Sequence, residues 1–318
     1  MIEVHLVGPE AADDVVSVIH AGFGAREVLD PPSTAPDETV ESVAAALADH
    51  GGMLARSEIG PVGALVFEPL DDEHALLGLR RVAVHPDAQG HGVARLLVRH
   101  AERVATERGY SAVRVLARAE LPRTLRFWQH LGYLETTREH PMVTLLKVLP
   151  VTVEVPSADD ARDLGERLAG VLGAGDLVIL SGDLGAGKTT FTQGVGRGLK
   201  VRGAVTSPTF VISRVHPSLD DGPPLVHVDA YRLGASADAG HLIDELDDLD
   251  LDASLDEAVT VVEWGEGVAE GLADTRLEVR IRRGRGEEAD EHRTVTFVPV
   301  GARWVGAGLR ALLTGALA

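Results

Sequence analysis

The sequence predicts an α/β protein with two domains, the first built on a mixed α+β sheet and the second on a mainly parallel sheet. Three observations lead to this prediction. The chain has 318 residues, more than a single domain usually holds. Segments with the alternation of strands and the periodicity of helices run to about residue 148, and the pattern then begins again. Each half also places a glycine-rich loop between an apolar strand and an amphipathic helix, so we expect domains at 1–148 and 149–318.

In the first domain, the elements follow from the spacing of apolar residues and from turn signals. The segment 30–37 (DPPSTAPD) is rich in turn-forming residues and separates the first two helices. Leu96, Leu97, Ala101 and Val104 share one face of a later helix. The expected order is strand 2–7, helices 12–22 and 38–49, strands 52–57, 63–68 and 75–84, helix 93–109, strand 112–117, helix 121–131 and strand 143–148.

In the second domain, Ser157 is a suitable N-cap for a helix that follows the strand 151–155 and ends near residue 172. The apolar run 177–180 predicts a short buried strand that leads into a glycine-rich loop and a further helix. Later strands are expected at 205, 210–215, 225–229, 259–264, 277–283 and 294–298.

Charge and composition exclude several classes of protein. The formal net charge is −19, with −7 in residues 1–150 and −12 in the rest, so neither half resembles a protein that binds phosphate backbones through a basic face. With no cysteine, the chain has no disulfide, thiolate zinc site or cysteine nucleophile. The N-terminus (MIEVHLVGPE) lacks the features of a signal peptide, and no apolar run reaches the ~18 residues of a membrane span. We therefore expect a cytoplasmic protein without membrane contact.

The segment 180–190 (LSGDLGAGKTT) contains the pattern G-x-x-x-x-G-K-[ST] of a phosphate-binding loop. Its glycines let backbone N–H groups turn toward phosphate oxygens, and the helix that follows directs its positive end at the anion. Lys188 can reach the β- and γ-phosphates of ATP, and the Thr189 hydroxyl can ligate Mg²⁺. The predicted ATP-binding residues are Gly182, Asp183, Leu184, Gly185, Ala186, Gly187, Lys188, Thr189 and Thr190.

A phosphate-binding loop needs an acid nearby to organise the metal, and two strand ends offer one. Asp229 ends the apolar segment LVHVD, and Glu263 ends VTVVE. The carboxyl ends of parallel strands meet at one edge of a sheet, where such folds hold ligands. We therefore predict that Lys188, Thr189, Asp229 and Glu263 act on the nucleotide.

Four motifs in this order resemble the TsaE family over about residues 151–300: GDLGAGKTTFTQG, TSPTF at 206–210, VDAYRL at 228–233 and VVEW at 261–264. The resemblance implies an ATPase of the bacterial pathway that installs N6-threonylcarbamoyl on adenosine 37 of tRNA. It implies Thr189 and Glu263 as magnesium ligands or water-bridged neighbours of the ion, and Asp229 as a Walker-B-like acid. It also places Thr209 in a switch segment that senses the γ-phosphate, and Trp264 beside the nucleotide, at a partner surface or in the core. The implied partners are the TsaD and TsaB proteins, which hold the transferase chemistry, with tRNA reached only through them.

A second loop lies in the first half, within residues 80–95 (RRVAVHPDAQGHGVAR). Gln89, Gly92 and Ala94 fill the pattern Q/R-x-x-G-x-G/A, and together with FWQHLGY at 127–133 they resemble the GNAT acetyltransferases over nearly all of residues 1–148. The resemblance implies acetyl-CoA, with its pyrophosphate at the start of a helix and its pantetheine arm paired with a strand. The implied acetyl-CoA-binding residues are Val82, Val84, Gln89, Gly90, His91, Gly92, Val93 and Ala94.

The acid and the base that acetyl transfer would need in the first half belong to no motif of the sequence. Many GNAT members carry a tyrosine acid where this chain has Trp128, and an indole has no acid function near neutral pH. Glu68, Glu73 and His85 are the nearest candidates for a general base, with His85 also a plausible turn residue before Pro86. The sequence does not identify the amine acceptor.

An alternative from another class makes the second half a P-loop phosphotransferase that acts on a small acceptor. Arg232, in the DAYRL segment, is then the candidate phosphate-facing arginine. In that interpretation the first half is a non-catalytic module that binds acyl-CoA or a partner protein.

Overall fold

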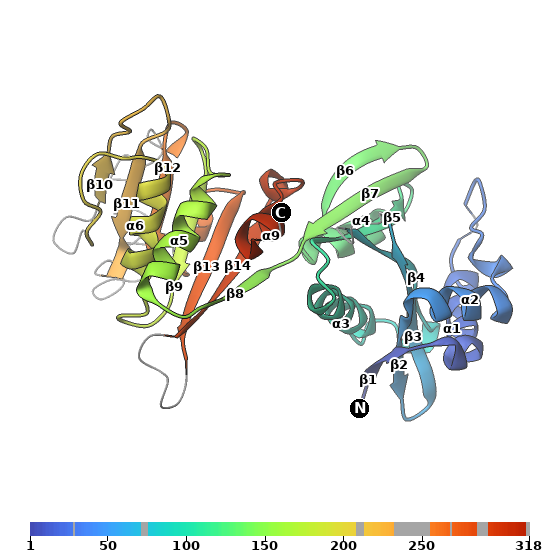
Figure 1. Cartoon of the computed structure of the whole chain (residues 1–318). Coiled ribbons are helices and arrows are strands. Elements are labelled where there is room, and N and C mark those ends of the chain that lie inside the picture. Colours follow the sequence, from blue (N-terminus) through green and yellow to red (C-terminus); the bar gives the residue numbers. More distant parts are fainter. Residues whose placement is uncertain are drawn as a thin grey trace. The chain divides into compact units, whose positions relative to one another are not determined.

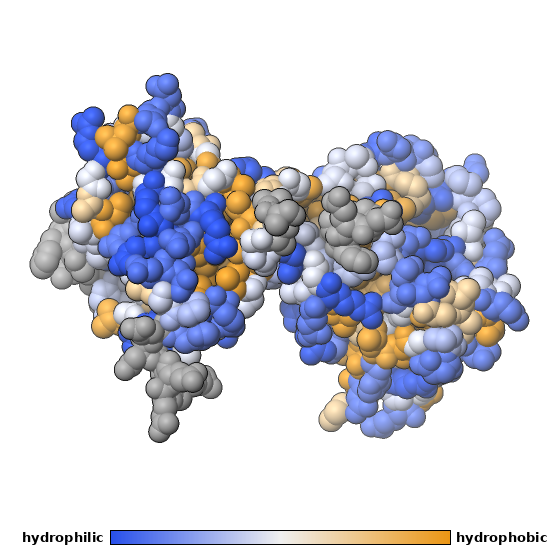
Figure 2. All heavy atoms as spheres, viewed as in Figure 1, coloured by the Kyte–Doolittle hydropathy of each residue, from blue (hydrophilic) through white to orange (hydrophobic). Residues whose placement is uncertain are grey.

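The computed structural model divides the chain into two compact units, Met1–Leu149 and Pro150–Ala318 (Figure 1). This division lies one residue after the predicted boundary between 148 and 149. No helix in the described part of the chain is long and apolar enough to cross a membrane. Figure 2 shows hydrophilic residues over much of the face in view, in keeping with a charged fraction of 25%. The structure describes residues 1–27, 29–70, 76–207, 213–231, 255–267, 269–284 and 292–315.

The N-terminal unit contains a seven-stranded sheet in the order β1-β2-β3-β4-β5-β7-β6. All neighbours run antiparallel except β4 and β5, which run parallel. Its strands are β1 (Glu3–Val7), β2 (Gly52–Ser57), β3 (Gly60–Pro69), β4 (Leu76–Val84), β5 (Ala112–Arg118), β6 (Leu134–Glu139) and β7 (Met142–Val148). Its helices are α1 (Ala12–Gly24), α2 (Val40–His50), α3 (Val93–Glu107) and α4 (Pro122–His130).

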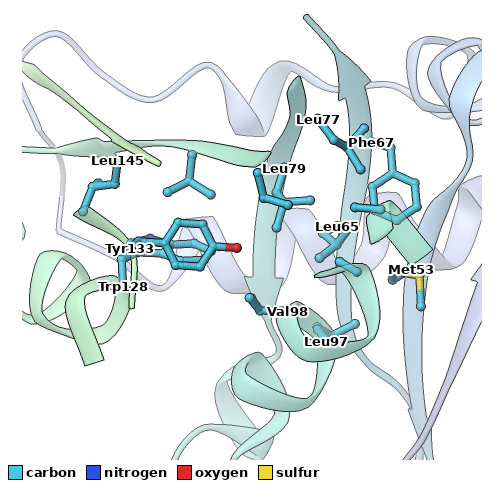
Figure 3. Packing of buried hydrophobic residues seen from close by; sticks show 14 of the residues in the cluster. Met53, Leu65, Phe67, Leu77, Leu79, Leu97, Val98, Trp128, Tyr133 and Leu145 are labelled. Carbon is cyan, nitrogen blue, oxygen red and sulfur yellow. The ribbon is translucent and has the colours of Figure 1, made fainter. Parts of the chain in front are cut away.

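Alternation along the strands divides the buried side chains of this unit between two faces. Phe67 and Leu79 belong to the core that packs against α3 and α4 (Figure 3). Val66 and Ala83 belong to a second core, under α1 and α2. Burying a side chain of this size stabilises a fold by ~1.5–3 kcal/mol, so the two cores fix which face each strand residue occupies.

Strands β4 and β5 separate after a short parallel contact. Their pairing runs only from Leu76 opposite Ala112 to Gly78 opposite Arg114. Farther along, Arg81 and Val82 both oppose the single residue Leu65 of β3, which is a β-bulge, and Arg81 has a φ of 53°. A bulge bends its strand and increases the local twist. The facing edges of β4 and β5 therefore lack a strand partner beyond this contact in the described part of the unit.

The C-terminal unit contains a seven-stranded sheet in the order β10-β11-β12-β9-β13-β14-β8. The four strands β11, β12, β9 and β13 run parallel, whereas β10, β14 and β8 pair antiparallel with their neighbours. The strands are β8 (Val151–Val155), β9 (Leu177–Ser181), β10 (Ser213–His216), β11 (Leu225–Asp229), β12 (Val259–Glu263), β13 (Arg276–Arg283) and β14 (Arg293–Val300). The helices are α5 (Ala158–Ala169), α6 (Lys188–Gly198) and α9 (Leu309–Thr314).

Glycines bring α5 and α6 into direct backbone contact. A Cβ added to Gly165 would lie 2.3 Å from the carbonyl oxygen of Phe191. A Cβ added to Gly194 would lie 2.0 Å from the carbonyl oxygen of Arg162. Because α6 begins directly after the phosphate-binding loop, this close packing holds its first turn against the rest of the unit.

Several elements differ from the sequence prediction. The strand β6 was not predicted because its residues (LETTRE) are mostly exposed and carry no apolar alternation. The helix α9 was also missed. A strand at Val205 was predicted wrongly, since this buried residue lies in no strand. The strand predicted at 210–215 is described only as Ser213–His216, because residues 208–212 lie outside the described ranges.

Candidate functional sites

The phosphate-binding loop occupies residues 182–187, between the end of β9 and the start of α6. Gly182, Gly185 and Gly187 have φ values of 149°, 70° and 107°, a region that side chains rarely allow. In this described segment no side chain caps the first turn of α6. The N–H groups of that turn are therefore available to an anion, and the positive end of the helix dipole favours one.

Lys188 is folded back onto its own loop. Its Nζ donates to the carbonyl oxygens of Gly182 at 2.7 Å and of Asp183 at 3.1 Å. The same Nζ lies 3.4 Å from the ring centroid of Trp264, a cation–π contact. Burial lowers the pKa of Lys188, although the nearby carboxylate of Glu263 acts in the opposite direction. The ammonium group is thus held next to the site where a phosphate would replace the carbonyl oxygens.

Glu263 is buried at the end of β12 and joins the loop to the sheet. Its Oε2 accepts a hydrogen bond from Thr189 Oγ1 at 3.0 Å, and its Oε1 accepts one from Thr192 Oγ1 at 3.5 Å. His227 Nε2 lies 2.8 Å from the same Oε1. The Nδ1 of this fully buried histidine has no partner in the described residues. The structure therefore brings together Thr189 and Glu263, which the sequence singled out, and adds His227, which it did not.

Asp229 lies opposite Glu263 in the parallel pairing of β11 and β12, so both acids reach the same edge of the sheet. Its Oδ2 accepts from Ser207 Oγ at 3.0 Å, and its Oδ1 accepts from the backbone N–H of Tyr231 at 3.1 Å. The ring of Tyr231 packs against Trp264 with 4.9 Å between centroids. An aromatic pair therefore lies beside the phosphate-binding lysine.

Three residues singled out in the sequence lie outside the described residues: Glu73, Thr209 and Arg232.

Two arginines of the strands β13 and β14 hold the outer side of the loop. Arg283 donates to the carbonyl oxygen of Gly185 from Nη2 at 2.7 Å and from Nε at 3.3 Å. Arg293 Nε donates to the carbonyl oxygen of Ala186 at 3.0 Å. Carbonyl groups fixed outward support N–H groups turned inward, as a phosphate cradle requires. Sequence reasoning missed both arginines, because they lie 98 and 107 residues from their partners and belong to no motif.

In the N-terminal unit, a cavity of about 970 Å³ opens where β4 and β5 separate. His91, one of the predicted acetyl-CoA residues, does not line it, and its Nδ1 lies 2.9 Å from the carbonyl oxygen of Gln89. The other seven predicted residues do line it: Val82, Val84, Gln89, Gly90, Gly92, Val93 and Ala94.

The loop before α3 has the backbone of an anion site. Gly90 and Gly92 have φ values of 79° and 78°, with open space where a Cβ would lie, and no side chain in this described segment caps α3. Along β4, the N–H of His85 donates to Val62, so the alternation of antiparallel pairing turns the backbone groups of Val84 away from β3. An extended ligand can therefore bind along this edge while its phosphates face the helix N-terminus.

Two aromatic residues near the cavity do not supply a proton at neutral pH. Trp128 lines the cavity, and its ring packs edge-on against Phe127 and Tyr133, at 5.1 and 4.9 Å between centroids. Tyr133 is completely buried next to Trp128 (Figure 3) and does not line the cavity. Burial raises the pKa of Tyr133 further. Neither Trp128 nor Tyr133 can therefore act as the tyrosine acid that the GNAT resemblance implies at position 128.

The two described candidates for a general base have different locations. Glu68 lines the cavity, and its Oε1 accepts from Arg80 Nη1 at 3.3 Å. His85 does not line the cavity, and its Nδ1 accepts from the backbone N–H of Asp87 at 3.4 Å to cap a short 3₁₀ turn. The geometry favours Glu68 and gives His85 a place in a turn.

Comparisons with known proteins match both halves of the chain. The family model described as "Threonylcarbamoyl adenosine biosynthesis protein TsaE" matches residues 155–294, and that described as "Acetyltransferase (GNAT) family" matches residues 25–133. The tRNA threonylcarbamoyladenosine biosynthesis protein TsaE of Streptomyces coelicolor is 62% identical over 151 residues, 48% of this chain and 98% of that protein. The protein of the same name from Mycobacterium tuberculosis (strain H37Rv) is 50% identical over 133 residues, 42% of this chain and 79% of that protein. Among solved structures, the paia N-acetyltransferase from Thermoplasma acidophilum in complex with coenzyme A has a TM-score of 0.41 and 13% identity, covering 46% of this chain and 99% of that chain.

Proposed function

Because the chain belongs to the TsaE family and carries a GNAT acetyltransferase domain before the TsaE domain, we propose that residues 149–318 hydrolyse ATP to drive the TsaD–TsaB assembly. The chain is a component of tRNA threonylcarbamoyladenosine biosynthesis fused to an acetyltransferase module. TsaD and TsaB hold the transferase chemistry and bind the tRNA in the cytoplasm. The net charge of −12 in the second half supports this division, because an acidic domain repels the phosphate backbone of tRNA.

The contact between Thr189 and Glu263 carries the proposal. A hydroxyl of the phosphate-binding loop and a strand-end carboxylate meet at 3.0 Å, at the edge of the sheet where nucleotides bind. ATP places its phosphates against the N–H groups of residues 182–189. Lys188 then exchanges the carbonyl oxygens of its loop for the β- and γ-phosphates, where its charge stabilises the transition state.

The residues at this edge fit a magnesium ion. Thr189, Glu263 and Asp229 offer only oxygen donors, which Mg²⁺ prefers. The described residues contain no group of three or more His, Cys, Asp or Glu side chains that could hold a metal alone, so a bound ion would also need phosphate oxygens and water as ligands. We assign Thr189 and Glu263 as ligands, and Asp229 as the Walker-B-like acid that Ser207 connects to the switch segment containing Thr209. When bound, Mg²⁺ neutralises charge on the phosphates.

For residues 1–148 we propose acetyl transfer from acetyl-CoA to an amine. Val82 and Val84 orient the pantetheine arm, and the loop 89–92 with the first turn of α3 binds the pyrophosphate. Glu68 takes a proton from the amine, which then attacks the carbonyl carbon of the thioester. Trp128 donates no proton, so the thiolate of coenzyme A is protonated from water.

The experiment that tests the ATPase proposal is complementation of a cell depleted of its own TsaE, with modified tRNA measured by mass spectrometry. We expect the full chain to restore the modification and Lys188→Ala to fail. Glu68→Gln, in the other domain, serves as the matched control and should restore it. In vitro, hydrolysis should be slow with the chain alone and rise when TsaD and TsaB are added. Rapid phosphate transfer to a small acceptor without these partners would instead establish a phosphotransferase.

Acetyl-CoA binding and turnover test the second activity separately. Calorimetry should detect acetyl-CoA binding to both the full chain and Lys188→Ala, because the cavity lies within the N-terminal unit. Release of free coenzyme A in the presence of an amine panel then measures transfer. Binding without turnover for every amine would support the alternative in which the domain is a non-catalytic module.

A further inference from the structure

A row of three residues crosses the cavity of the N-terminal unit. Glu68 on β3 pairs with Gly78 on β4, and Gly78 pairs with Arg114 on β5. Residues paired across neighbouring strands share one face of a sheet, and all three line the cavity. The row therefore places an acid and an arginine on either side of a glycine.

This face is the one opposite α3 and α4. Val113 and Val115, which flank Arg114, belong to the core under those helices, so Arg114 points the other way. The same alternation applies to Glu68, which follows the core residue Phe67. The acyl-CoA loop adjoins the N-terminus of α3. The row thus lies on the opposite face of the sheet, where an acceptor can approach the splayed strands.

The two charged groups leave space between them. Neighbouring strands lie ~4.8 Å apart, so the Cα atoms of Glu68 and Arg114 are separated by roughly 10 Å. Only a glycine fits at position 78 without displacing Glu68, because a Cβ on Gly78 would lie 2.9 Å from the carbonyl oxygen of Glu68 and 3.4 Å from its Oε2. The carboxylate therefore leans over the glycine toward β5. Among the described residues, Glu68 and Arg114 form no ion pair with each other.

Both groups have unused bonding capacity. Glu68 Oε1 accepts from Arg80, whereas Oε2 makes no hydrogen bond within the described residues. Arg114 is half-buried, and within the same described residues it has neither a hydrogen bond nor an ion pair. A guanidinium group that is partly removed from water and lacks a partner favours an anionic ligand, most of all a carboxylate that matches its planar fork.

The other arginines around the cavity do not offer the same opportunity. The described lining contains seven arginines against one acid, although the whole chain has a net charge of −19. Arg95 lies on α3 and Arg123 on α4, so both belong to the face of the sheet that carries the proposed acyl-CoA loop. Arg118 is bonded to Glu120 at 2.8 Å and to the carbonyl oxygens of residues 30 and 31. The remaining three have partners in Glu38, Glu68 or the backbone of β4: Arg26, Arg80 and Arg81.

We propose that the acceptor is a small zwitterion, a free amino acid whose ammonium group binds Glu68 and whose carboxylate binds Arg114 above Gly78. This inference rests on the acetyl transfer proposed above. The ammonium group gives one proton to Glu68, which passes it to solvent, and the free amine attacks the thioester carbonyl. A C–N bond forms and the C–S bond breaks. The second amine proton leaves to water, the thiolate takes one proton to become coenzyme A, and one proton is released overall.

Initial rates of coenzyme A release by the full chain test this assignment. The panel pairs free α-, β- and γ-amino acids with their amides, with the corresponding amines and with peptides that begin with the same residue. We expect the free amino acids to react with a kcat/KM higher by about tenfold or more, because only they place a carboxylate on Arg114. Acetylation of amides or peptides as efficiently as of amino acids would overturn the proposal while leaving acetyl transfer established.

Variants separate the acceptor site from the acyl-CoA site. Arg114→Gln should raise the KM for the amino acid about tenfold or more without changing the KM for acetyl-CoA, and Arg114→Lys should recover part of the loss. Arg95→Gln is the matched control and should raise the KM for acetyl-CoA instead. An Arg114→Gln variant that alters only the KM for acetyl-CoA would contradict the assignment.

If no amine is acetylated, calorimetric binding of amino acids tests the proposed acceptor site instead. Free amino acids and their N-acetyl products are titrated by calorimetry into the chain saturated with coenzyme A, alongside the matched amides. Binding that requires the carboxylate and disappears in Arg114→Gln supports the site. Failure of every amino acid and N-acetyl amino acid to bind refutes it, whereas failure of acetyl-CoA itself to bind would refute the proposed acetyltransferase.

Discussion

The backbone contact between α5 and α6 predicts a large effect from adding a single methyl group. In Gly194→Ala the new Cβ would lie 2.0 Å from the carbonyl oxygen of Arg162, where ordinary contact begins at 3.4 Å. The helices must therefore move apart by about 1.4 Å at this point. The nearest atoms belong to the backbone, so no side chain can turn away to make room.

The magnitude follows from two opposing terms. Overpacking costs typically ~1–3 kcal/mol, and a backbone partner places this case at the upper end. Alanine gains ~1 kcal/mol over glycine inside a helix, which offsets part of the loss. The net expectation is a loss of about 2 kcal/mol in the free energy of unfolding of the C-terminal unit, or roughly 4–8 °C in its Tm.

The assay is thermal and urea unfolding of Gly194→Ala beside Gly173→Ala. A Cβ on Gly173 meets nothing within 4 Å, so this control should be neutral or slightly stabilising. Because α6 carries Lys188 and Thr189, the shifted helix should also weaken ATP binding while acetyl-CoA binding stays unchanged. Equal stability of the two variants would show that the helices are not in backbone contact and would refute the reasoning.

Three further predictions concern side chains at the two sites. Lys188→Ala should abolish ATP binding, and loss of acetyl-CoA binding in the same variant would contradict two independent sites. Arg283→Gln should weaken ATP and ADP about equally in calorimetry, because the arginine supports the loop through Gly185; an effect on ATP alone would indicate contact with the γ-phosphate instead. The hydrogen bond from Arg118 lowers the pKa of Glu120 to about 2. The contribution of this pair to the free energy of unfolding should therefore be complete above pH 4.5 and lost as the pH falls through about 2. A carboxyl titration followed by NMR checks this, and a midpoint near 4.5 in the unaltered chain would rule out the pairing.

The parts of the proposed nucleotide site that the sequence predicted are local in the chain. The loop 182–189 follows a fixed spacing, and Asp229 and Glu263 each end an apolar strand. Parallel strands bring their ends to one edge, so the contact between Thr189 and Glu263 follows from strand identity alone. His227 carried a weaker signal, because it lies two residues before Asp229 and therefore on the same face of β11.

The parts that could not be predicted depend on pairing between distant segments. Arg283 meets its loop only because β13 lies beside β9 in the sheet. Arg114 faces Glu68 only because Gly78 aligns with both, and that register depends on where β4 and β5 stop pairing. The choice between Glu68 and His85 likewise required the cavity itself. No local pattern of apolar or charged residues encodes such a register.

The two candidate anion sites share the same backbone arrangement but differ in how their charged side chains are paired. Each places positive-φ glycines before a helix without a side-chain cap. In the second unit, however, Lys188 Nζ donates to two carbonyl oxygens of its own loop and lies over the ring of Trp264. In the proposed nucleotide site, a phosphate bound by Lys188 would compete with those carbonyl oxygens, so only the difference between the two sets of contacts would contribute to affinity. The same carbonyl oxygens would give the ammonium group a partner when the proposed product, ADP, is released. A lysine with this alternative would suit the proposed ATPase, which must pass repeatedly between loaded and empty states.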